Sequence, residues 1–136
     1  MSVTVPAETT ALTYEVGGAD RPALYRAALA AVLEALYGTS PAAPPGEGSG
    51  VVPLQAAGRD EEGRLGGLLA ELLREAPAVP GRLHPPAWLS FDENRATATL
   101  RVGPPGPPAR ALRLEGVRFR AEGPAGLCAT IELAPG

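Results

Sequence analysis

The sequence predicts a single α+β domain, residues 1–136, in which two helices pack on a mainly antiparallel mixed sheet in two layers. The first half holds two segments whose apolar residues recur at helical spacing, and the last third alternates apolar and polar residues with a period of two. The chain has 136 residues, 45% of them apolar, which suffices for one hydrophobic core. The expected element order is β-α-β-α-β-β-β-β.

Residues 12–16 alternate and form the first predicted strand. Asp20 is a suitable N-cap for the first helix, with Pro22 in the first turn, where a missing N–H does no harm. This helix is expected to run to Tyr37 and to end at Gly38. Its expected buried stripe consists of Leu24, Ala28, Ala31, Val32, Ala35 and Leu36.

Residues 39–50 lack periodicity and are expected to form a loop. Residues 51–55 are predicted to be a short strand at a sheet edge, because Pro53 has no N–H to donate to a neighbouring strand. A second helix follows from about Asp60 to Ala76. Its apolar stripe consists of Leu65, Leu68, Leu69, Leu72, Leu73 and Ala76.

Three glycines, Gly63, Gly66 and Gly67, lie inside this second helix. Each costs a helix about 1 kcal/mol relative to alanine. Either the helix therefore begins nearer Leu65, or the glycines allow close approach of another backbone.

Residues 78–87 are expected to form a Pro-rich loop that carries His84, a surface residue in this interpretation. Residues 88–91 and 96–102 are predicted to be paired strands joined by a turn. Residues 103–109 form the next expected loop.

The segment 110–133 is predicted to be a β-hairpin that closes the fold. The even-numbered Leu112 and Leu114 are the apolar residues before Gly116, and from Val117 the odd-numbered residues are apolar. This change of parity keeps one face buried only if the strand has an extra residue, and Gly116 is the natural position for that β-bulge. In the return strand Glu132 lies on the face opposite the core.

Composition excludes several classes of function. The net charge is −3, so the basic excess typical of nucleic-acid or membrane-surface binding is absent. All 12 basic residues are arginine, which excludes a Schiff-base or P-loop lysine. The single Cys and single His exclude an internal disulfide, a Cys-based zinc site and a multi-histidine site. Since no signal peptide or apolar run of about 20 residues is visible, we expect a cytoplasmic protein.

The order of elements and several short strings resemble the archease family, small proteins that assist the tRNA-splicing RNA ligase by promoting its guanylylation and turnover. The family begins with a His-Thr-Ala-Asp motif, which aligns here with Glu-Thr-Thr-Ala at residues 8–11. Its acidic residue before a Leu-rich helix aligns with Asp60, which precedes LGGLLAELL. Its two closing strands align with residues 110–115 and 129–132.

The resemblance implies a fold, a partner and a set of candidate ligands. Archeases hold a metal with three acidic positions, which correspond here to Ala11, Asp60 and Glu132; alanine replaces the first ligand and glutamate the last. The motif histidines correspond to Glu8 and Glu115. The implied partner is an RNA ligase, and the implied role is accessory rather than catalytic.

Two interpretations of the acidic positions stay open. Asp60 and Glu132, with Glu8 as a possible third, would suit a hard cation such as Ca²⁺ or Mg²⁺ if carbonyls and water complete the shell. Alternatively, Asp60 is a helix N-cap and Glu132 is a solvated strand residue paired with Arg118 or Arg120.

The other reactive side chains point to no catalysis. Cys128 has no His or Asp near it in sequence to activate its thiol. The arginines of the closing hairpin would meet a phosphate or acidic partner, or form a salt-bridged solvent face: Arg110, Arg113, Arg118 and Arg120.

Three functions are therefore weighed. The first is an archease-like accessory protein. The second is a diverged module without the metal site that acts as a protein-interaction or structural unit. An unrecognised enzyme is least favoured, because no nucleophile–base pair or multi-ligand cluster is visible. No direct nucleic-acid or membrane partner is expected, and the oligomeric state is left open.

Overall fold

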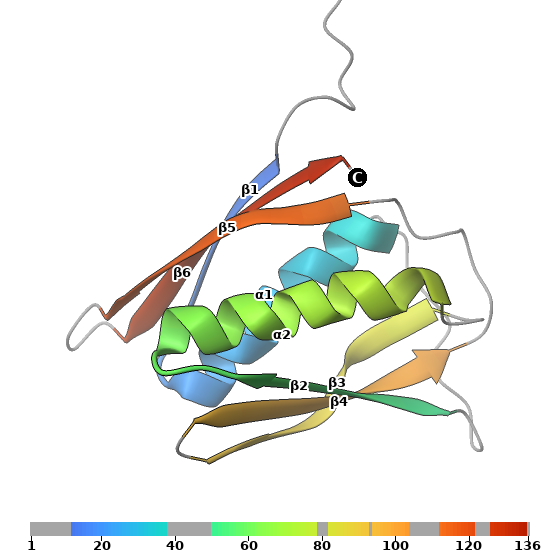
Figure 1. Cartoon of the computed structure of the whole chain (residues 1–136), viewed down its shortest axis with the longest axis horizontal. Helices are drawn as coiled ribbons and strands as arrows, with labels where there is room; N and C mark the ends of the chain where they lie inside the picture. Colours follow the sequence, from blue (N-terminus) through green and yellow to red (C-terminus); the bar gives the residue numbers. More distant parts are fainter. Residues whose placement is uncertain are drawn as a thin grey trace, which may run out of the picture.

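The computed structural model confirms the α+β class and the element order (Figure 1). It describes residues 12–37, 50–78, 82–92, 94–103, 112–121 and 126–135. The elements are β1 (Leu12–Gly18), α1 (Arg21–Tyr37), β2 (Val51–Ala57), α2 (Glu61–Glu75), a 3₁₀ turn (Ala76–Ala78), β3 (Arg82–Phe91), β4 (Arg95–Gly103), β5 (Leu112–Ala121) and β6 (Leu127–Pro135). Neither helix is long and apolar enough to cross a membrane.

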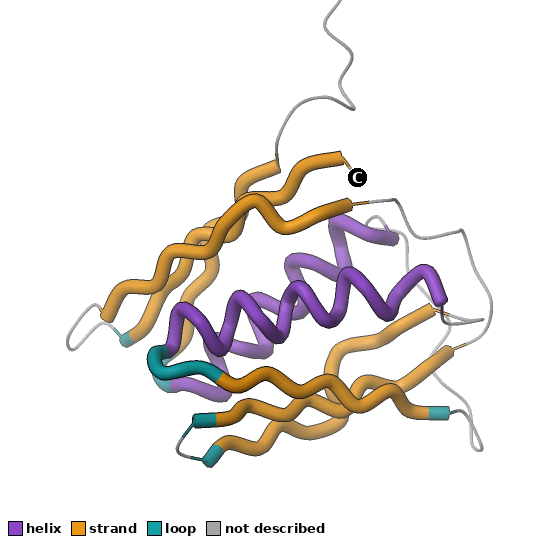
Figure 2. Tube along the Cα trace, in the orientation of Figure 1, coloured by secondary structure: helices purple, strands orange, loops and turns teal. Residues whose placement is uncertain are grey.

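The strands form two sheets rather than the single mixed sheet that the sequence predicts. The first sheet has the order β1-β6-β5 and the second β2-β4-β3, and every pairing is antiparallel. The two helices lie between the sheets (Figures 1 and 2). Helix α1 contacts β1, β6 and β3, and α2 contacts β2, β4 and β5. Each helix therefore has to bury two sides, one against each sheet.

Helix α1 shows this double burial most clearly. The Asp20 carboxylate accepts a hydrogen bond from the Ala23 N–H at 3.0 Å, which confirms the predicted N-cap. The whole predicted stripe is buried, but so are Tyr25, Leu29 and Leu33 on other sides of the helix. The single-stripe prediction was too narrow because it assumed one sheet. Gly38, its predicted end, lies outside the described residues.

Helix α2 begins at Glu61, which confirms the predicted start near Asp60; the alternative of a start nearer Leu65 is wrong. The Asp60 carboxylate caps it by accepting from the Gly63 N–H at 2.7 Å. The alternative, close approach, holds for Gly67: a Cβ added there would lie 3.1 Å from the Ala56 Cβ of β2. The missing side chain brings the helix against the strand.

The closing hairpin has the predicted bulge. The register between β5 and β6 shifts between Leu114 and Gly116, so that Leu114 stands opposite Leu133 and Val117 opposite Ile131. Both sides of the bulge thus keep their apolar residues on the inner face. The connecting turn, residues 122–125, lies outside the described residues.

The predicted loop at residues 78–87 is largely strand. After the 3₁₀ turn, β3 begins at Arg82, and its register with β4 is irregular on both sides of Pro86. Because β3 is an edge strand, prolines without an N–H cost it no inter-strand bond on the free side. The same reason allows Pro53 in β2, the opposite edge, as predicted.

Candidate functional site

The structure places the two acidic candidates in different local roles. Asp60 caps α2, and Glu132 lies half-buried on β6, opposite Thr13 of β1 and Gly116 of β5. A Cβ added at Gly116 would lie 3.4 Å from the Glu132 Oε1, so this carboxylate lies beside the bulge. No hydrogen bond joins Asp60 to Glu132. Glu8 and Ala11 lie outside the described residues.

The metal hypothesis gains no further ligands from the described part of the chain. There, no group of three or more His, Cys, Asp and Glu side chains is placed to hold a metal ion. In the hairpin, the Arg113 Nε forms an ion pair with the Glu115 Oε2 at 2.7 Å. This contact fits the salt-bridged interpretation of the hairpin arginines; Arg110 is outside the described residues.

A buried polar network, which sequence reasoning missed, joins the first turns of the two helices. The Glu61 carboxylate accepts a hydrogen bond from the Tyr25 hydroxyl at 2.7 Å. The same carboxylate pairs with Arg64 Nη2 at 2.9 Å and with Arg21 Nε at 2.5 Å. Arg64 is only 6% exposed, and its Nη1 also donates to the Gly58 carbonyl at 3.3 Å. We call Arg21, Tyr25, Glu61 and Arg64 the Glu61 cluster.

The surroundings of this cluster shift the pKa values of Tyr25 and Arg64 upward. Burial raises the pKa of Tyr25, and its hydrogen bond to Glu61 raises it further, so the hydroxyl stays a donor. Burial acts to lower the pKa of Arg64, but the hydrogen bond and charge of Glu61 outweigh it and the pKa is raised. The cluster thus holds a neutral phenol and a fixed ion pair, neither of which is poised for proton transfer.

Aromatic contacts extend the Glu61 cluster to the second sheet. The Tyr25 and Phe91 rings meet edge to face with their centroids 4.9 Å apart. The Arg21 guanidinium lies 5.4 Å from the centroid of the Phe91 ring. The cluster therefore fastens α1, α2 and β3 together, and its chemistry is structural. The only sequence signal was its spacing, since Arg21 and Tyr25 are four residues apart and Glu61 and Arg64 three.

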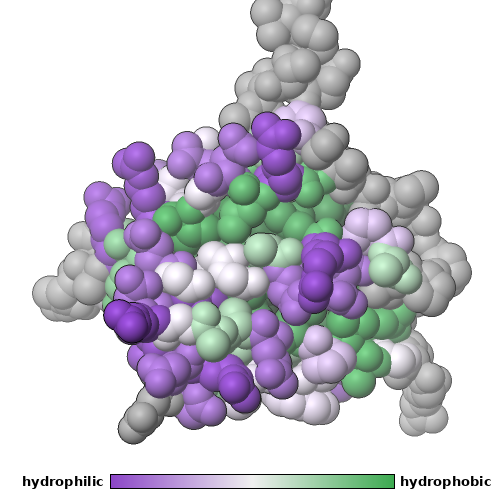
Figure 3. Space-filling view, viewed as in Figure 1, coloured by the Kyte–Doolittle hydropathy of each residue, from purple (hydrophilic) through white to green (hydrophobic). Residues whose placement is uncertain are grey.

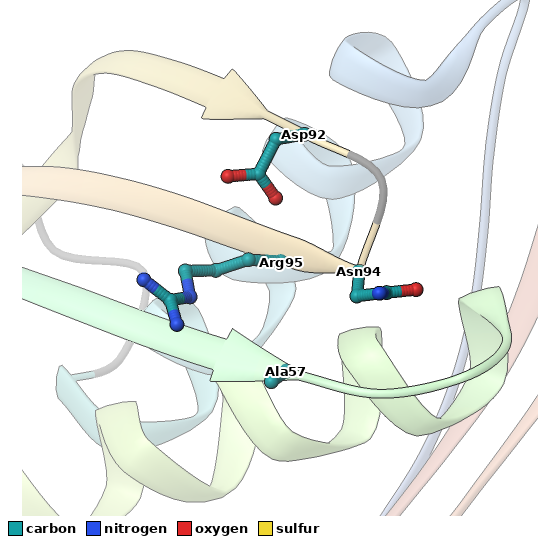
Figure 4. Close-up of a pocket in the computed structure, with 4 residues that line it drawn as sticks. All are labelled: Ala57, Asp92, Asn94 and Arg95. Atoms are coloured by element: carbon teal, nitrogen blue, oxygen red, sulfur yellow. The ribbon is translucent and has the colours of Figure 1, made fainter.

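An open hollow of about 470 Å³ lies at the β3–β4 turn, lined by Ala57, Asp92, Asn94 and Arg95 (Figure 4). The Asn94 carbonyl accepts a hydrogen bond from the Gly58 N–H at 2.9 Å, which ties the turn to the end of β2. All four lining residues are exposed. Asp92, Asn94 and Arg95 are all in contact with solvent, whereas ligand sites usually enclose their polar groups. The hollow therefore lacks the enclosure that is typical of a catalytic site.

His84 corrects another prediction. It lies in β3, not in a surface loop, and its Nε2 is buried without a hydrogen-bond partner among the described residues. A Cβ at Gly103 would fall on the ring, so this glycine makes room for the imidazole. Burial, assisted by the charge of Arg82, lowers the pKa of His84. The imidazole is therefore kept neutral.

An apolar seam runs between β5 and α2 (Figure 3). The β5 residues Leu114 and Val117 are half-buried and pack against the core. A Cβ added at Gly66 of α2 would lie 3.8 Å from the Val117 Cγ2, which is ordinary van der Waals contact. The seam therefore has room for a methyl group at Gly66, beside Val117.

No model of a known protein family matches the chain, and no curated protein is significantly similar to it. The archease resemblance therefore rests on the short strings and on the order of the elements.

Proposed function

We propose that this protein is a non-catalytic, archease-like accessory protein that assists a tRNA-splicing RNA ligase in the cytoplasm. The observation that supports the proposal is the position of Asp60. It lies directly before the Leu-rich α2, in a chain with the order β-α-β-α-β-β-β-β, as the family motif requires. Glu132 near the end of the last strand occupies the second matching position.

The non-catalytic part of the proposal is supported by how the chain uses its polar groups. In the Glu61 cluster the carboxylate forms ion pairs with arginines of the same cluster, and the Tyr25 hydroxyl stays protonated. His84 is neutral with its Nε2 buried. Groups held in this way support binding to another protein better than chemistry on a substrate.

Guanylylation of the RNA ligase from the same organism tests the function directly. The amount of ligase–guanylate formed with time is measured with and without the protein, at several molar ratios. We expect faster formation and more turnovers per ligase when the protein is present. An unchanged rate at saturating protein would overturn the proposal.

The second candidate is a module of the same fold without a metal site. One observation favours it: an Asp60 carboxylate oxygen is already engaged by the Gly63 N–H at 2.7 Å. The first candidate instead gives Asp60 and Glu132 a residual site for Ca²⁺ or Mg²⁺, with water filling the remaining positions.

Calorimetric titration with Ca²⁺, Mg²⁺ and Mn²⁺ separates these two candidates. Asp60→Asn removes the charge but keeps an effective N-cap. Asp20→Asn is the matched control, because Asp20 caps α1 in the same way and belongs to no proposed site. Binding that disappears in Asp60→Asn and survives in Asp20→Asn supports the residual site. If no heat of binding is measured at millimolar metal, the second candidate, the module without a metal site, is supported.

A further inference from the structure

The second sheet turns one face to the helices and leaves the other uncovered by any described helix or strand. Register assigns the uncovered side chains: Trp88 stands opposite Thr99 on β4, which in turn stands opposite Pro53 on β2. One row further along, Val51 stands opposite Arg101. We call this surface, Val51, Pro53, Trp88, Arg95, Thr99 and Arg101, the outer face of the second sheet.

The part of this face nearer Arg101 is apolar, whereas the next row toward Arg95 consists of Gln55, Thr97 and Ser90. Val51 is 52% exposed and Trp88 is 58% exposed, and these are the two exposed large hydrophobic residues in the described part of the chain. Both lie on this face, in adjacent rows. Thr99, flanked by Pro53 and Trp88, is only 8% exposed. A single exposed apolar side chain needs no explanation, but several on one face of a sheet, here on both sides of β4, are typical of an interaction site.

Its charge is positive in an acidic chain. Arg95 and Arg101, both exposed, lie at opposite ends of this face of β4, and neither has an ion-pair partner among the residues that the structure describes. The described acid at this face is Asp92, at the turn. The whole chain, by contrast, has a net charge of −3. Two exposed cations therefore lie on the same face as the exposed apolar residues.

We propose that the outer face of the second sheet binds an acidic protein surface with an apolar centre. Trp and Arg are the residues that most often dominate protein interfaces, and here Trp88 and Arg101 lie beside Val51 and Pro53 on one face. Carboxylates on the partner would meet Arg95 and Arg101 at the two ends. Naming the RNA ligase as that partner rests on the proposed function.

Charge and shape argue against two other occupants. A second copy placed face to face by a two-fold axis would oppose two cationic faces, and Asp92 is the one described acid that each copy would supply for two arginines. A nucleic acid could stack a base on Trp88 and pair phosphates with the two arginines. Val51 and Pro53, however, offer its phosphates no hydrogen-bond donor, and the net negative charge of the chain repels it.

The single tryptophan of the chain makes the face directly observable. We would replace Trp88 biosynthetically with 5-fluorotryptophan, which gives one ¹⁹F resonance regardless of tryptophans in the partner. Four additions are compared: the purified RNA ligase, an acidic peptide that alternates Asp and Glu with Leu and Phe, a 12-nucleotide oligouridine, and the unlabelled protein itself. We expect the resonance to shift with the ligase and with the acidic peptide, and to recover as salt is raised.

Charge reversal supplies the matched variants. Arg101→Glu, on this face, should weaken both interactions about tenfold or more. Arg118→Glu, on the exposed outer side of β5 in the first sheet, should leave them within about twofold. Both positions are exposed, and thermal melts of the variants check that they fold.

The outcomes separate the two proposals. Stimulation of the ligase without a shift of the Trp88 resonance would keep the proposed function and overturn the binding face. A shift with the acidic peptide without any effect on the ligase would keep the face and overturn the function. A shift with oligouridine alone, or with the protein alone, would overturn the acidic partner, and so would no shift with any of the four.

Discussion

The outer faces of the two sheets differ although the sheets have the same size and the same relation to the helices. The first sheet presents charges of both signs: Glu15, Glu132, Arg118 and Arg120 alternate with Thr13 and Thr130. The second sheet presents Trp88 and Val51 between two arginines without described partners. The outer face of the first sheet is thus polar and well solvated, whereas that of the second sheet exposes apolar side chains and two arginines without described ion-pair partners.

The free edge of the first sheet is also partly satisfied within the chain. The Glu62 carboxylate of α2 accepts a hydrogen bond from the Phe119 N–H of the edge strand β5 at 3.0 Å. A side chain that occupies an edge N–H discourages pairing with another strand. The contrast indicates that the chain satisfies exposed groups of the first sheet with its own side chains. The outer face of the second sheet is the one that we propose a partner covers. The predictions below test this contrast, from the largest effect on stability to the smallest.

The largest effect is expected at the Glu61 cluster, which fastens the two helices to each other and to β3 of the second sheet. Glu61→Ala leaves the buried Arg64 charge without its partner carboxylate and should cost about 3–5 kcal/mol in the free energy of unfolding. Glu71→Ala, which removes the partner of the exposed Arg74, should cost less than about 1 kcal/mol. Urea denaturation of both variants measures the difference. Equal losses would show that the cluster is not the fastening that we describe.

The inner faces should be equivalent, in contrast to the outer ones. Leu133 of the first sheet and Leu100 of the second are both fully buried. Leu133→Ala and Leu100→Ala should each cost about 2–5 kcal/mol, since both delete buried apolar volume. A loss below about 1 kcal/mol in one of them, in urea titrations, would mean that the corresponding sheet is not part of the cooperative core.

Helix α2 should respond differently where it meets each sheet. Gly66→Ala has room beside Val117 of the first sheet and should stabilise the protein by about 0.5–1 kcal/mol through helix propensity. Gly67→Ala places its Cβ 3.1 Å from the Ala56 Cβ of the second sheet and should lose that gain. Thermal melts of the two variants compare their stabilities. A Gly67→Ala variant more stable than Gly66→Ala would contradict the packing described here.

His84, on an edge strand of the second sheet, should make stability depend on pH. Its pKa in the folded state is lowered from 6.5, so as pH falls the unfolded chain binds a proton before the folded protein does. The stability contribution of His84 is complete above pH 6.5 and is lost as pH falls through 6.5 toward the lower folded-state pKa. The difference in unfolding free energy between wild type and His84→Gln, measured from pH 8 to 5, should shrink in that window. A difference that stays constant over this pH range would contradict the role of His84 in the pH dependence of stability.

The smallest effect on stability is expected on the outer face of the second sheet. Trp88→Thr and Val51→Thr should change the free energy of unfolding by no more than about 0.5 kcal/mol, because both side chains are mostly exposed. Their effect should appear in partner binding instead. Chemical denaturation that shows a loss above about 2 kcal/mol would mean that Trp88 is a packing residue.

Local features of this fold were readable from the sequence because they depend on a few neighbouring residues. Asp20 and Asp60 were recognisable as N-caps or helix starts, and the change of parity located the bulge at Gly116. The second half of β3, residues 88–91, was predicted, but its first half, residues 82–87, was missed because consecutive prolines hide its alternation. They also explain its irregular register.

Long-range features were not readable. Alternation says which side of a strand is apolar, but not that β1 pairs with β6 and β2 with β4, so one sheet was predicted in place of two. The Glu61 cluster was missed for the same reason, because Tyr25 and Glu61 are 36 residues apart in the chain. Of the candidate site, the cap role of Asp60 was foreseen as one alternative, while the ligand role of Asp60 and Glu132 stays a prediction.

The two outer faces each carry a unique reactive residue, Trp88 on the second sheet and Cys128 on the first. Hydroxyl-radical footprinting of the protein with a saturating amount of RNA ligase reads both in one sample. The account predicts that the oxidation rate of Trp88 falls at least about threefold on binding, as its exposed surface is covered, while that of Cys128 is unchanged. Protection of Cys128 with Trp88 still fully reactive would contradict it.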